Sequence, residues 1–397
     1  MKTIKDSIHD YISVEGVAMD LMDTPRVQRL RRLKQLGTTF HVYPSANHTR
    51  FEHSLGVYHL SNKVIDQLNI EPELAETLRA AAMLHDIGHG PFSHNTEPIM
   101  KRETGKSHSD ISDILSKGEI KETLDHHGIS SSDVFALIKG EGRYGQLLAS
   151  SLDIDRMDYL VRDAHHTGVP YGSIDHNRLI GQLSFSGSDL VLGENSIHVA
   201  QSLLTARALM YPTVYGHHAT RISEMMVQRG TDKLIDLGEI VGEDLRHMDD
   251  YDLMVMLRDT EDTSQLAQRI DNRNLFKRAI WVPSGSVPKQ VIEADYTKIR
   301  EYEAEISSEA ELEDEEVIVE VPEYPTESGA SIPIKVDDSI QKMTEKSPLV
   351  SAIDQSILDQ WRFGVYAPQD KIPQAREAAE RILGLDIQES FIEDRDK

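Results

Sequence analysis

The chain has 397 residues, with 42 Lys and Arg against 67 Asp and Glu, which gives a formal net charge of −25. Its length suits two or three domains, and its hydrophobic content of 39% is typical of a folded chain. The charge excludes a protein that coats nucleic acid or an anionic membrane, because phosphates would be repelled over most of its surface.

The sequence contains no cysteine, which excludes a disulfide framework and a thiolate zinc site. Its first residues lack the apolar stretch of a signal peptide, and no run of about 18 apolar residues occurs anywhere. We therefore expect a cytoplasmic protein with no membrane partner.

Apolar residues at helical spacing dominate the first two-thirds of the chain. They predict helices at 17–36, 52–68, 72–87, 108–115, 132–138, 144–161, 177–183 and 199–229. An alternating stretch at 183–192, with Gly187 and Ser188 at its centre, predicts a small β-hairpin inserted between helices. The pattern favours a mainly α fold built on a helical bundle.

From about residue 271 the pattern changes to short apolar runs bounded by Pro and Gly. It predicts strands at 279–282, 317–321, 332–336 and 363–366, and helices at 351–361 and 373–383. We therefore expect a smaller α+β domain over 271–397, following a first domain over 1–270. Within it, residues 301–327 hold twelve acidic residues and no Lys or Arg, which predicts a solvated helix or loop.

The strongest chemical motif is the segment from Leu84 to His94. There an apolar helix ends in His85 and Asp86, and two glycines and a proline follow. An imidazole and a carboxylate at one helix end can both reach a single metal ion. A buried histidine beside a helix-terminal aspartate would give the same local pattern, so further donors are needed to favour a metal site.

Two other segments supply such donors, because His53 and Asp155 each lie at the beginning of a further helix. Asp155, Tyr159 and Asp163 share one helical face, whereas Asp153 lies about 200° away, so Asp155 is the expected ligand. With His85 and Asp86, the set offers two nitrogen and two oxygen donors. That mixture suits one divalent transition metal ion (Mn²⁺, Fe, Ni²⁺ or Zn²⁺) better than a bare Mg²⁺ site.

Together these motifs resemble the HD phosphohydrolase superfamily. The segments 23–30, 35–37, 50–56, 84–94 and 153–163 are similar to its deoxynucleoside-triphosphate triphosphohydrolase branch, in particular to the catalytic domain of the vertebrate SAM-and-HD-domain members. The resemblance implies an HD-domain bundle over residues 1–270, with the metal core at about 50–165. It also implies metal-dependent hydrolysis of dNTPs to deoxynucleoside and inorganic triphosphate, with Mg²⁺ as a further ion on the triphosphate.

The same resemblance implies roles for individual residues. His108 would transfer a proton, oriented by Glu97, while His89 and His94 would lie against the phosphates. Arg50, Arg156 and Arg207 would hold the triphosphate, and Tyr159 would contact a phosphate or the sugar. Gln35 and Asp163 match residues that bind the 3′-hydroxyl, Leu36 and Tyr215 match those that fill the space of a 2′-hydroxyl, and Tyr211 replaces a histidine, which leaves the base contacts open.

An effector site is implied near the N-terminus, where four residues match a guanine-nucleotide site for GTP or dGTP: Lys2, Asp23, Gln28 and Arg31. An amphipathic helix with a solvated basic face would also explain this basic stretch. Thr213 and His218 stand where the family has cations at a second effector site. The resemblance further implies a homodimer or homotetramer.

Two other functions stay open at this stage. One is an HD phosphohydrolase that acts on another nucleotide or phosphate ester, and the other is a regulatory nucleotide sensor with a disabled site. The complete set of metal donors, together with His108, favours an enzyme.

Overall fold

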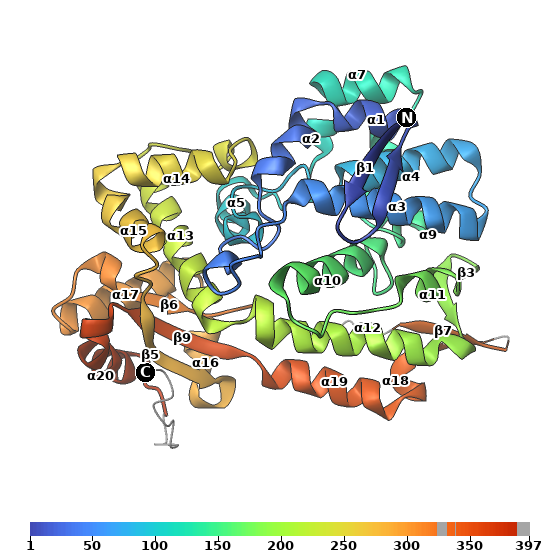
Figure 1. The fold of residues 1–397 in the computed structure, drawn as a ribbon. Helices are drawn as coiled ribbons and strands as arrows, with labels where there is room; N and C mark the ends of the chain where they lie inside the picture. Colours follow the sequence, from blue (N-terminus) through green and yellow to red (C-terminus); the bar gives the residue numbers. More distant parts are fainter. Residues whose placement is uncertain (324–331, 338, 387–397) are drawn as a thin grey trace.

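Helices around one large apolar core form the first part of the chain. The computed structural model describes residues 1–323, 332–337 and 339–386 (Figure 1). Strands β1 (Lys2–Asp6) and β2 (Asp10–Val14) pair antiparallel at the N-terminus. The helices that follow are α1 (Gly16–Met22), α2 (Pro25–Arg29), α3 (Arg50–Leu68), α4 (Pro72–Leu84), α5 (Glu97–Thr104), α6 (Ser112–Leu115), α7 (Gly118–His126), α8 (Ser131–Ile138), α9 (Gly142–Gly145), α10 (Ile154–Thr167) and α11 (His176–Ile180).

The next elements lead from this bundle to a second helical layer. The predicted hairpin is present as β3 (Leu183–Ser186) and β4 (Asp189–Gly193). Helices α12 (Ile197–Met210), α13 (His218–Asp236), α14 (Asp250–Asp259) and α15 (Glu261–Asp271) follow. Apolar side chains of α13, α14 and α15 form a second core with α5. The prediction of a mainly α fold with a hairpin insertion is confirmed.

The C-terminal part contains a three-stranded antiparallel sheet in the order β5 (Lys277–Pro283), β9 (Arg362–Ala367), β6 (Ile318–Glu320). Helices α17 (Tyr296–Glu309) and α20 (Ile372–Leu383) pack with this sheet around a third core, and the short α16 (Lys289–Ile292) precedes them. The acidic segment begins inside α17, and its residues 324–327 lie outside the described residues. Glu303 and Glu320 within it are buried rather than solvated, because each is paired with an arginine of α13.

A later stretch of the chain joins the first part instead. Strand β7 (Pro333–Val336) pairs parallel with β4 and antiparallel with β8 (Ser339–Lys342), which extends the hairpin to a four-stranded sheet. Helices α18 (Met343–Lys346) and α19 (Pro348–Asp359) follow, and α19 packs along α12 (Figure 1). A domain division near residue 271 therefore stays a prediction, because residues 332–359 share the core of the first part.

Two of the predicted long helices are interrupted by proline. Residues 17–36 form α1, α2 and a short 3₁₀ turn, with Pro25 at the first position of α2, where its missing N–H costs nothing. Residues 199–229 are divided between α12 and α13 by a wide turn, Tyr211–Tyr215, which contains Pro212. Proline breaks a continuing helix because it lacks the N–H donor and its ring clashes with the preceding turn.

Two further helical predictions were too long. Within 144–161, α9 ends at Gly145 and α10 begins only after Asp153, whose side chain accepts a hydrogen bond from the Arg156 N–H and so caps the helix. Within 108–115, only α6 is helical, so His108 lies in the loop before it. No helix in the described ranges is both long and apolar enough to cross a membrane.

Gly56 allows α3 and α10 to approach each other closely. A Cβ atom at this position would lie 1.9 Å from Asp158 Oδ1 and 2.5 Å from Arg162 Nη2, both buried side chains of α10. We predict that Gly56→Ala lowers the free energy of unfolding by about 2–3 kcal/mol, as overpacking of a core does. Urea unfolding measures this, and Gly285→Ala, where a Cβ would meet open space, is the matched control. Equal stability of the two variants would contradict the close packing.

Candidate metal site and adjoining cavity

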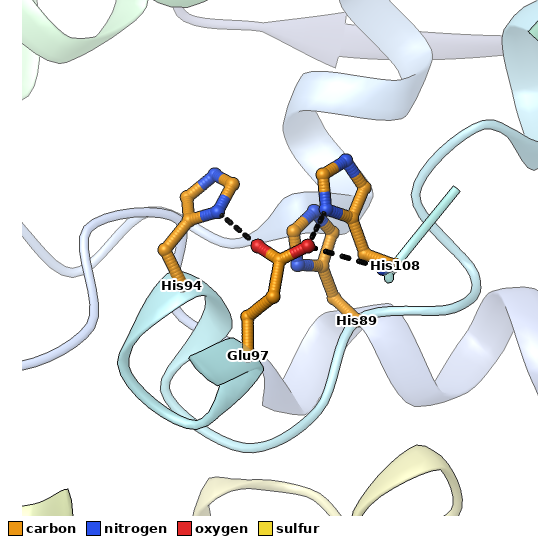
Figure 2. Close-up of side chains that lie close together, drawn as sticks. All are labelled: His89, His94, Glu97 and His108. Atoms are coloured by element: carbon orange, nitrogen blue, oxygen red, sulfur yellow. Dashed lines mark hydrogen bonds and ion pairs between the residues drawn. The ribbon is translucent and has the colours of Figure 1, made fainter. Parts of the chain in front are cut away.

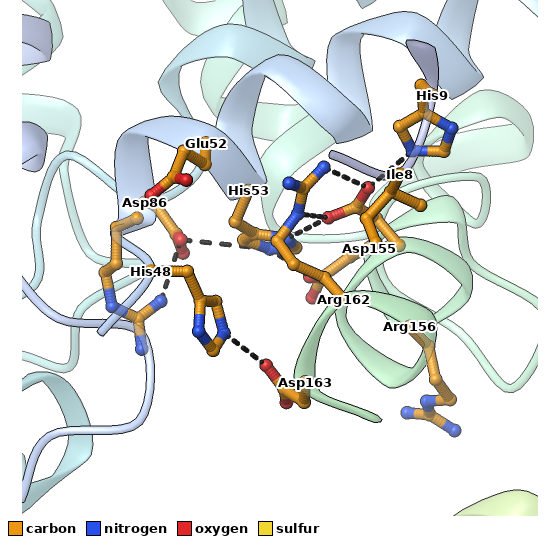
Figure 3. Close-up of polar contacts among 12 residues, drawn as sticks. Ile8, His9, His48, Glu52, His53, Asp86, Asp155, Arg156, Arg162 and Asp163 are labelled. Atoms are coloured by element: carbon orange, nitrogen blue, oxygen red, sulfur yellow. Dashed lines mark hydrogen bonds and ion pairs between the residues drawn. The ribbon is translucent and has the colours of Figure 1, made fainter. Parts of the chain in front are cut away.

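Three helices bring four predicted metal ligands together, and Figure 3 shows three of them, His53, Asp86 and Asp155. His53 lies on the first turn of α3, His85 and Asp86 follow the end of α4, and Asp155 lies on the first turn of α10. A capping box between Thr49 and Glu52 fixes the start of α3. His53 Nε2 lies 3.3 Å from His85 Nε2, 2.8 Å from Asp155 Oδ1 and 3.9 Å from Asp86 Oδ2.

The hydrogen bonds of the two imidazoles show which nitrogens face the centre of the cluster. His53 Nδ1 lies 2.8 Å from Asp158 Oδ2, and His85 Nδ1 lies 2.9 Å from the Ala82 carbonyl oxygen. Both partners are acceptors, so each Nδ1 carries a proton and each Nε2 can present a lone pair. Ligands of one ion at bonding distances of about 2.1 Å lie about 3 Å apart, as these nitrogens do. The donors therefore fit a divalent metal ion.

The charges of the cluster fit a bound cation as well. Burial lowers the pKa of His53, but the hydrogen bonds to Asp155 and Asp158 outweigh it and raise the pKa to about 10. Burial raises the pKa of Asp86, but Arg50, His85 and His89 hold it well below its usual range. The site thus attracts positive charge, which a metal ion would supply in place of a proton. The side chain of Asp153 caps α10 and takes no part in the cluster.

Asp158 supports the cluster and was missed in the sequence analysis. It is fully buried and accepts hydrogen bonds from His53 Nδ1, His9 Nε2 and Arg162, which also binds Asp6. Histidine ligands of metals commonly donate their second N–H to such a carboxylate, which fixes the tautomer. The signal available in the sequence was a second acidic residue between apolar neighbours on the helix that carries Asp155.

A second cluster lies beside the first and contains the predicted catalytic residues (Figure 2). Glu97, the first residue of α5, accepts hydrogen bonds from His108 Nδ1, from the His108 backbone N–H at 3.1 Å and from His94 Nδ1 at 2.7 Å. The ring of His89 stacks on that of His108, with centroids 4.0 Å apart, and His89 Nε2 lies 3.3 Å from Asp86 Oδ1. The structure therefore brings His89, His94, Glu97 and His108 together next to the quartet of predicted metal ligands, His53, His85, Asp86 and Asp155.

The electrostatics of this second cluster suit proton transfer. Burial raises the pKa of Glu97, but the hydrogen bonds from His108 and His94 outweigh it and hold the pKa far below its usual range. Burial and the nearby Arg50 charge hold the pKa of His89 well below its usual value, so His89 is neutral. Donor atoms of the four residues lie within 4.8 Å of one another and could hold an ion. However, both Glu97 oxygens already accept hydrogen bonds, which favours a positioning role for this carboxylate.

The turn that carries His94 is held in place by residues far away in the sequence. Phe92 and Ser93 have left-handed backbone conformations, with φ of 55° and 60°, which are unfavourable for residues with a Cβ. The Phe92 N–H donates to Asp250 Oδ1 at 2.6 Å, and Ser93 Oγ donates to the Lys34 carbonyl at 2.6 Å. Asp250, at the start of α14, thereby holds the turn that carries His94, and no local pattern in the sequence predicted this contact.

A cavity of about 440 Å³ reaches the second cluster at His94. Eight of the nine predicted substrate residues line it: Gln35, Leu36, Arg50, Tyr159, Asp163, Arg207, Tyr211 and Tyr215. Arg50 connects it to the metal cluster, because its Nη1 donates to Asp86 Oδ2 at 2.7 Å and its Nε donates to Ser93 Oγ at 2.6 Å. Arg50 Nη2 and Gln35 Oε1 are buried and have no hydrogen-bond partner among the described residues, so both can bind a ligand.

Two of the cavity residues are bonded to each other, and the ninth predicted residue lies elsewhere. Tyr215 donates to Asp163 Oδ2 at 2.8 Å, and His48 lies 2.8 Å from Asp163 Oδ1, so this carboxylate is held from both sides. Arg156 is not among the residues that line the cavity. It points away from the metal cluster in Figure 3 and lies beside Asp153.

Of the predicted effector residues, Lys2 lies on β1, Asp23 directly follows α1, Gln28 lies on α2 and Arg31 lies in the 3₁₀ turn after it. Lys2 is paired with Asp23, and Arg31 Nε donates to Gln28 Oε1 at 2.9 Å. The Arg31 guanidinium also lies over the ring of Phe51, at 3.5 Å from its centroid. The four side chains thus form two pairs, and their role in binding a nucleotide stays a prediction.

A histidine–aspartate quartet held by three helices is the hallmark of an HD-domain phosphohydrolase. Comparison with family models agrees, because residues 50–163 match the HD domain and residues 174–394 match the HD associated region. The chain therefore belongs to the family in which an HD domain is followed by an HD associated region.

Three relatives illustrate the range of similar proteins. An uncharacterized protein of Methanocaldococcus jannaschii is 34% identical, over 95% of this chain and 81% of its own length. The deoxynucleoside triphosphate triphosphohydrolase SAMHD1 homolog of Dictyostelium discoideum is 31% identical, over 70% of this chain and 59% of its own. The crystal structure of a phosphohydrolase from Bacteroides thetaiotaomicron superimposes with a TM-score of 0.75 at 29% identity, covering 93% of this chain and all of that one.

Asp158, the buried carboxylate that accepts from His53 Nδ1, gives a first test of the metal site. We predict that Asp158→Asn weakens Mn²⁺ binding by about 10- to 100-fold, because His53 loses the acceptor that fixes its tautomer and orientation. Calorimetric titration of the metal-free protein measures this affinity. Asp175→Asn, at the N-cap of α11, is the matched control and leaves it unchanged. Unaltered Mn²⁺ affinity in a folded Asp158→Asn protein would show that Asp158 does not support the site.

Proposed function

We propose that this protein hydrolyses deoxynucleoside triphosphates to deoxynucleoside and inorganic triphosphate in a metal-dependent reaction. One observation carries the proposal. Arg50 bonds the predicted metal ligand Asp86 and also lines a nucleotide-sized cavity, where its Nη2 lacks a partner among the described residues. Phosphate bound by this guanidinium would lie beside the metal cluster, and the rest of the nucleotide would lie in the cavity.

The reaction breaks the bond between the α-phosphorus and the 5′-oxygen while a water oxygen bonds to phosphorus. A divalent ion in the quartet would supply Lewis-acid polarisation and lower the pKa of the water. Arg50 and Arg207 neutralise charge on the triphosphate. His108 gives a proton to the departing 5′-oxygen. Because Glu97 accepts a hydrogen bond from its Nδ1, the Nε2 atom carries the transferable proton.

The residues predicted to contact the sugar support a deoxyribose substrate. Gln35, with its unpartnered buried Oε1, and Asp163 would bind the 3′-hydroxyl, as the resemblance implies. Leu36 and Tyr215 line the same cavity and would leave no partner for a 2′-hydroxyl, which disfavours ribonucleotides. Hydrolysis of another phosphate ester remains the alternative. Activation by GTP or dGTP, assembly as a homo-oligomer, cytoplasmic location, Mg²⁺ on the triphosphate and the identity of the metal also stay predictions.

Product analysis tests the proposed reaction. The four dNTPs are incubated with the protein and Mn²⁺, with and without GTP, and the products are separated by ion-exchange chromatography. We expect deoxynucleoside and triphosphate in equal amounts, and no products after His85→Ala or Asp86→Ala. His126→Ala, an exposed histidine of α7, is the control and keeps full activity. Absence of turnover with every dNTP, or release of monophosphate instead, would refute the proposal.

The pair of Glu97 and His108 gives a separate prediction. His108→Ala is expected to lower kcat by about 10²- to 10⁴-fold, because the leaving oxygen loses its proton donor. Glu97→Gln is expected to lower kcat less, because the imidazole remains but loses its anionic partner. KM for dNTP changes little in both variants. Steady-state kinetics measure these values, and full activity of His108→Ala would exclude this residue as the acid.

A further inference from the structure

A partly buried ion pair of α13 lines the cavity, whereas none of the four predicted metal ligands does. Arg221 and Glu224, one turn apart on α13, both line it, whereas the quartet comes from α3, α10 and the end of α4. Arg221 Nη1 donates to Glu224 Oε2 at 2.5 Å. Neither residue takes part in the proposed hydrolysis, so the pair is available for another role in the cavity.

The geometry of the pair is fixed by the C-terminal sheet. Arg221 Nε donates to Glu320 Oε1 of β6 at 2.8 Å, and Arg221 Nη2 donates to the same oxygen. Tyr366 of β9, which is fully buried, donates its hydroxyl to the other oxygen of Glu320. These contacts use three of the five N–H groups of the guanidinium. Among the described residues, two N–H groups are therefore left for a ligand.

The charges around this ion pair favour a ligand that donates hydrogen bonds to Glu224. One guanidinium stands between two carboxylates, Glu224 and Glu320, so the trio has a surplus negative charge. Burial, together with the neighbouring Glu320, raises the pKa of Glu224 to about 7 although Arg221 opposes the shift. The Asn95 amide nitrogen can donate to Glu224 Oε1 at 3.2 Å, and Asn95 lines the same cavity. A ligand that donates hydrogen bonds to Glu224 would relieve this imbalance.

The edge of guanine has the complementary pattern. Its N1–H and N2–H₂ groups are adjacent donors that one carboxylate can accept together, and its O6 and N7 atoms are acceptors that arginine binds. Adenine places an acceptor at N1 and a donor at its 6-position, which opposes a guanidinium. Thymine has one N–H between two carbonyl groups, and cytosine has a single amino donor. Tyr211 and Trp361 also line the cavity and offer aromatic surface against a base.

We propose that Arg221 and Glu224 form the base-recognition wall of this cavity and that they select guanine, which makes dGTP the preferred substrate. The inference rests on the proposed dNTP hydrolysis and deepens it. Glu224 accepts from N1–H and N2–H of the base, and Arg221 donates to O6. The buried contacts to Glu320 and Tyr366 keep the guanidinium in position, so the C-terminal sheet contributes to base selection.

The test measures kcat/KM for dGTP, dATP, dCTP and dTTP, with GTP held at one saturating concentration so that a guanine effector site would be occupied equally. We expect dGTP to be preferred by about tenfold or more over each other dNTP, which is the range for one good bidentate base contact. Glu224→Gln should remove most of this preference by lowering kcat/KM for dGTP, with changes below about twofold for dTTP. Glu239→Gln, exposed three residues beyond α13, is the matched control and keeps the preference.

Calorimetric binding of deoxyguanosine and thymidine, again with saturating GTP, separates base recognition from hydrolysis. Tighter binding of deoxyguanosine, lost in Glu224→Gln, supports the inference even if no dNTP is hydrolysed, and that result would refute only the proposed reaction. Equal kcat/KM for the four dNTPs together with equal binding of the two nucleosides would overturn the guanine preference and leave the proposed reaction intact. Unchanged dGTP preference in a folded Glu224→Gln protein would also overturn it.

Discussion

Two buried imidazole nitrogens that face each other across 3.3 Å are the constraint around which the site is built. The Nδ1 atoms of His53 and His85 are both turned outward to acceptors, so their Nε2 atoms face the carboxylates: His53 Nε2 lies 2.8 Å from Asp155 Oδ1, and His85 Nε2 lies 3.4 Å from Asp86 Oδ1. Such an arrangement is unfavourable unless a cation or a proton lies between the groups. A metal ion bound there would therefore connect residues of α3, of the end of α4 and of α10.

Hydrogen bonds of arginine side chains connect the metal cluster to the cavity. Arg50 binds Asp86 and Ser93, and Ser93 binds the backbone of Lys34, whose neighbour Gln35 lines the cavity. Arg221, which also lines the cavity, joins Glu224 to Glu320. One guanidinium thus contacts the predicted metal ligand Asp86, and the other reaches the C-terminal sheet. Arginine suits both places because its planar group makes several directed hydrogen bonds and keeps its charge when buried.

Local patterns in the sequence predicted those features that depend on neighbouring residues. The His85–Asp86 pair at a helix end, the helical face with Asp155, Tyr159 and Asp163, and the hairpin around Gly187 all follow from spacing. The resemblance to a known family supplied the nine predicted substrate residues, eight of which line one cavity. The prediction was wrong near Pro25 and Pro212, because the apolar residues keep their helical spacing where the helix itself is interrupted.

Features that depend on distant contacts had a weak local signal or none. Asp158 and Asp250 resemble ordinary helix aspartates until packing buries them against His53 and the Phe92 turn. The parallel pairing of β4 with β7 joins Leu192 to Ile334, and a single sequence contains no pattern that reveals such a pair. For the same reason Glu320 was expected in a solvated acidic segment, whereas Arg221 holds it in the core.

The position of a bound metal tests the account most directly, because two clusters of donor residues lie side by side. Crystals of the Mn²⁺-loaded protein would be measured on both sides of the manganese absorption edge to obtain an anomalous difference map. The account predicts one peak within bonding distance of His53, His85, Asp86 and Asp155. A peak among His89, His94, Glu97 and His108 with none at the quartet would contradict it, because His108 could not then act as a proton donor held by Glu97.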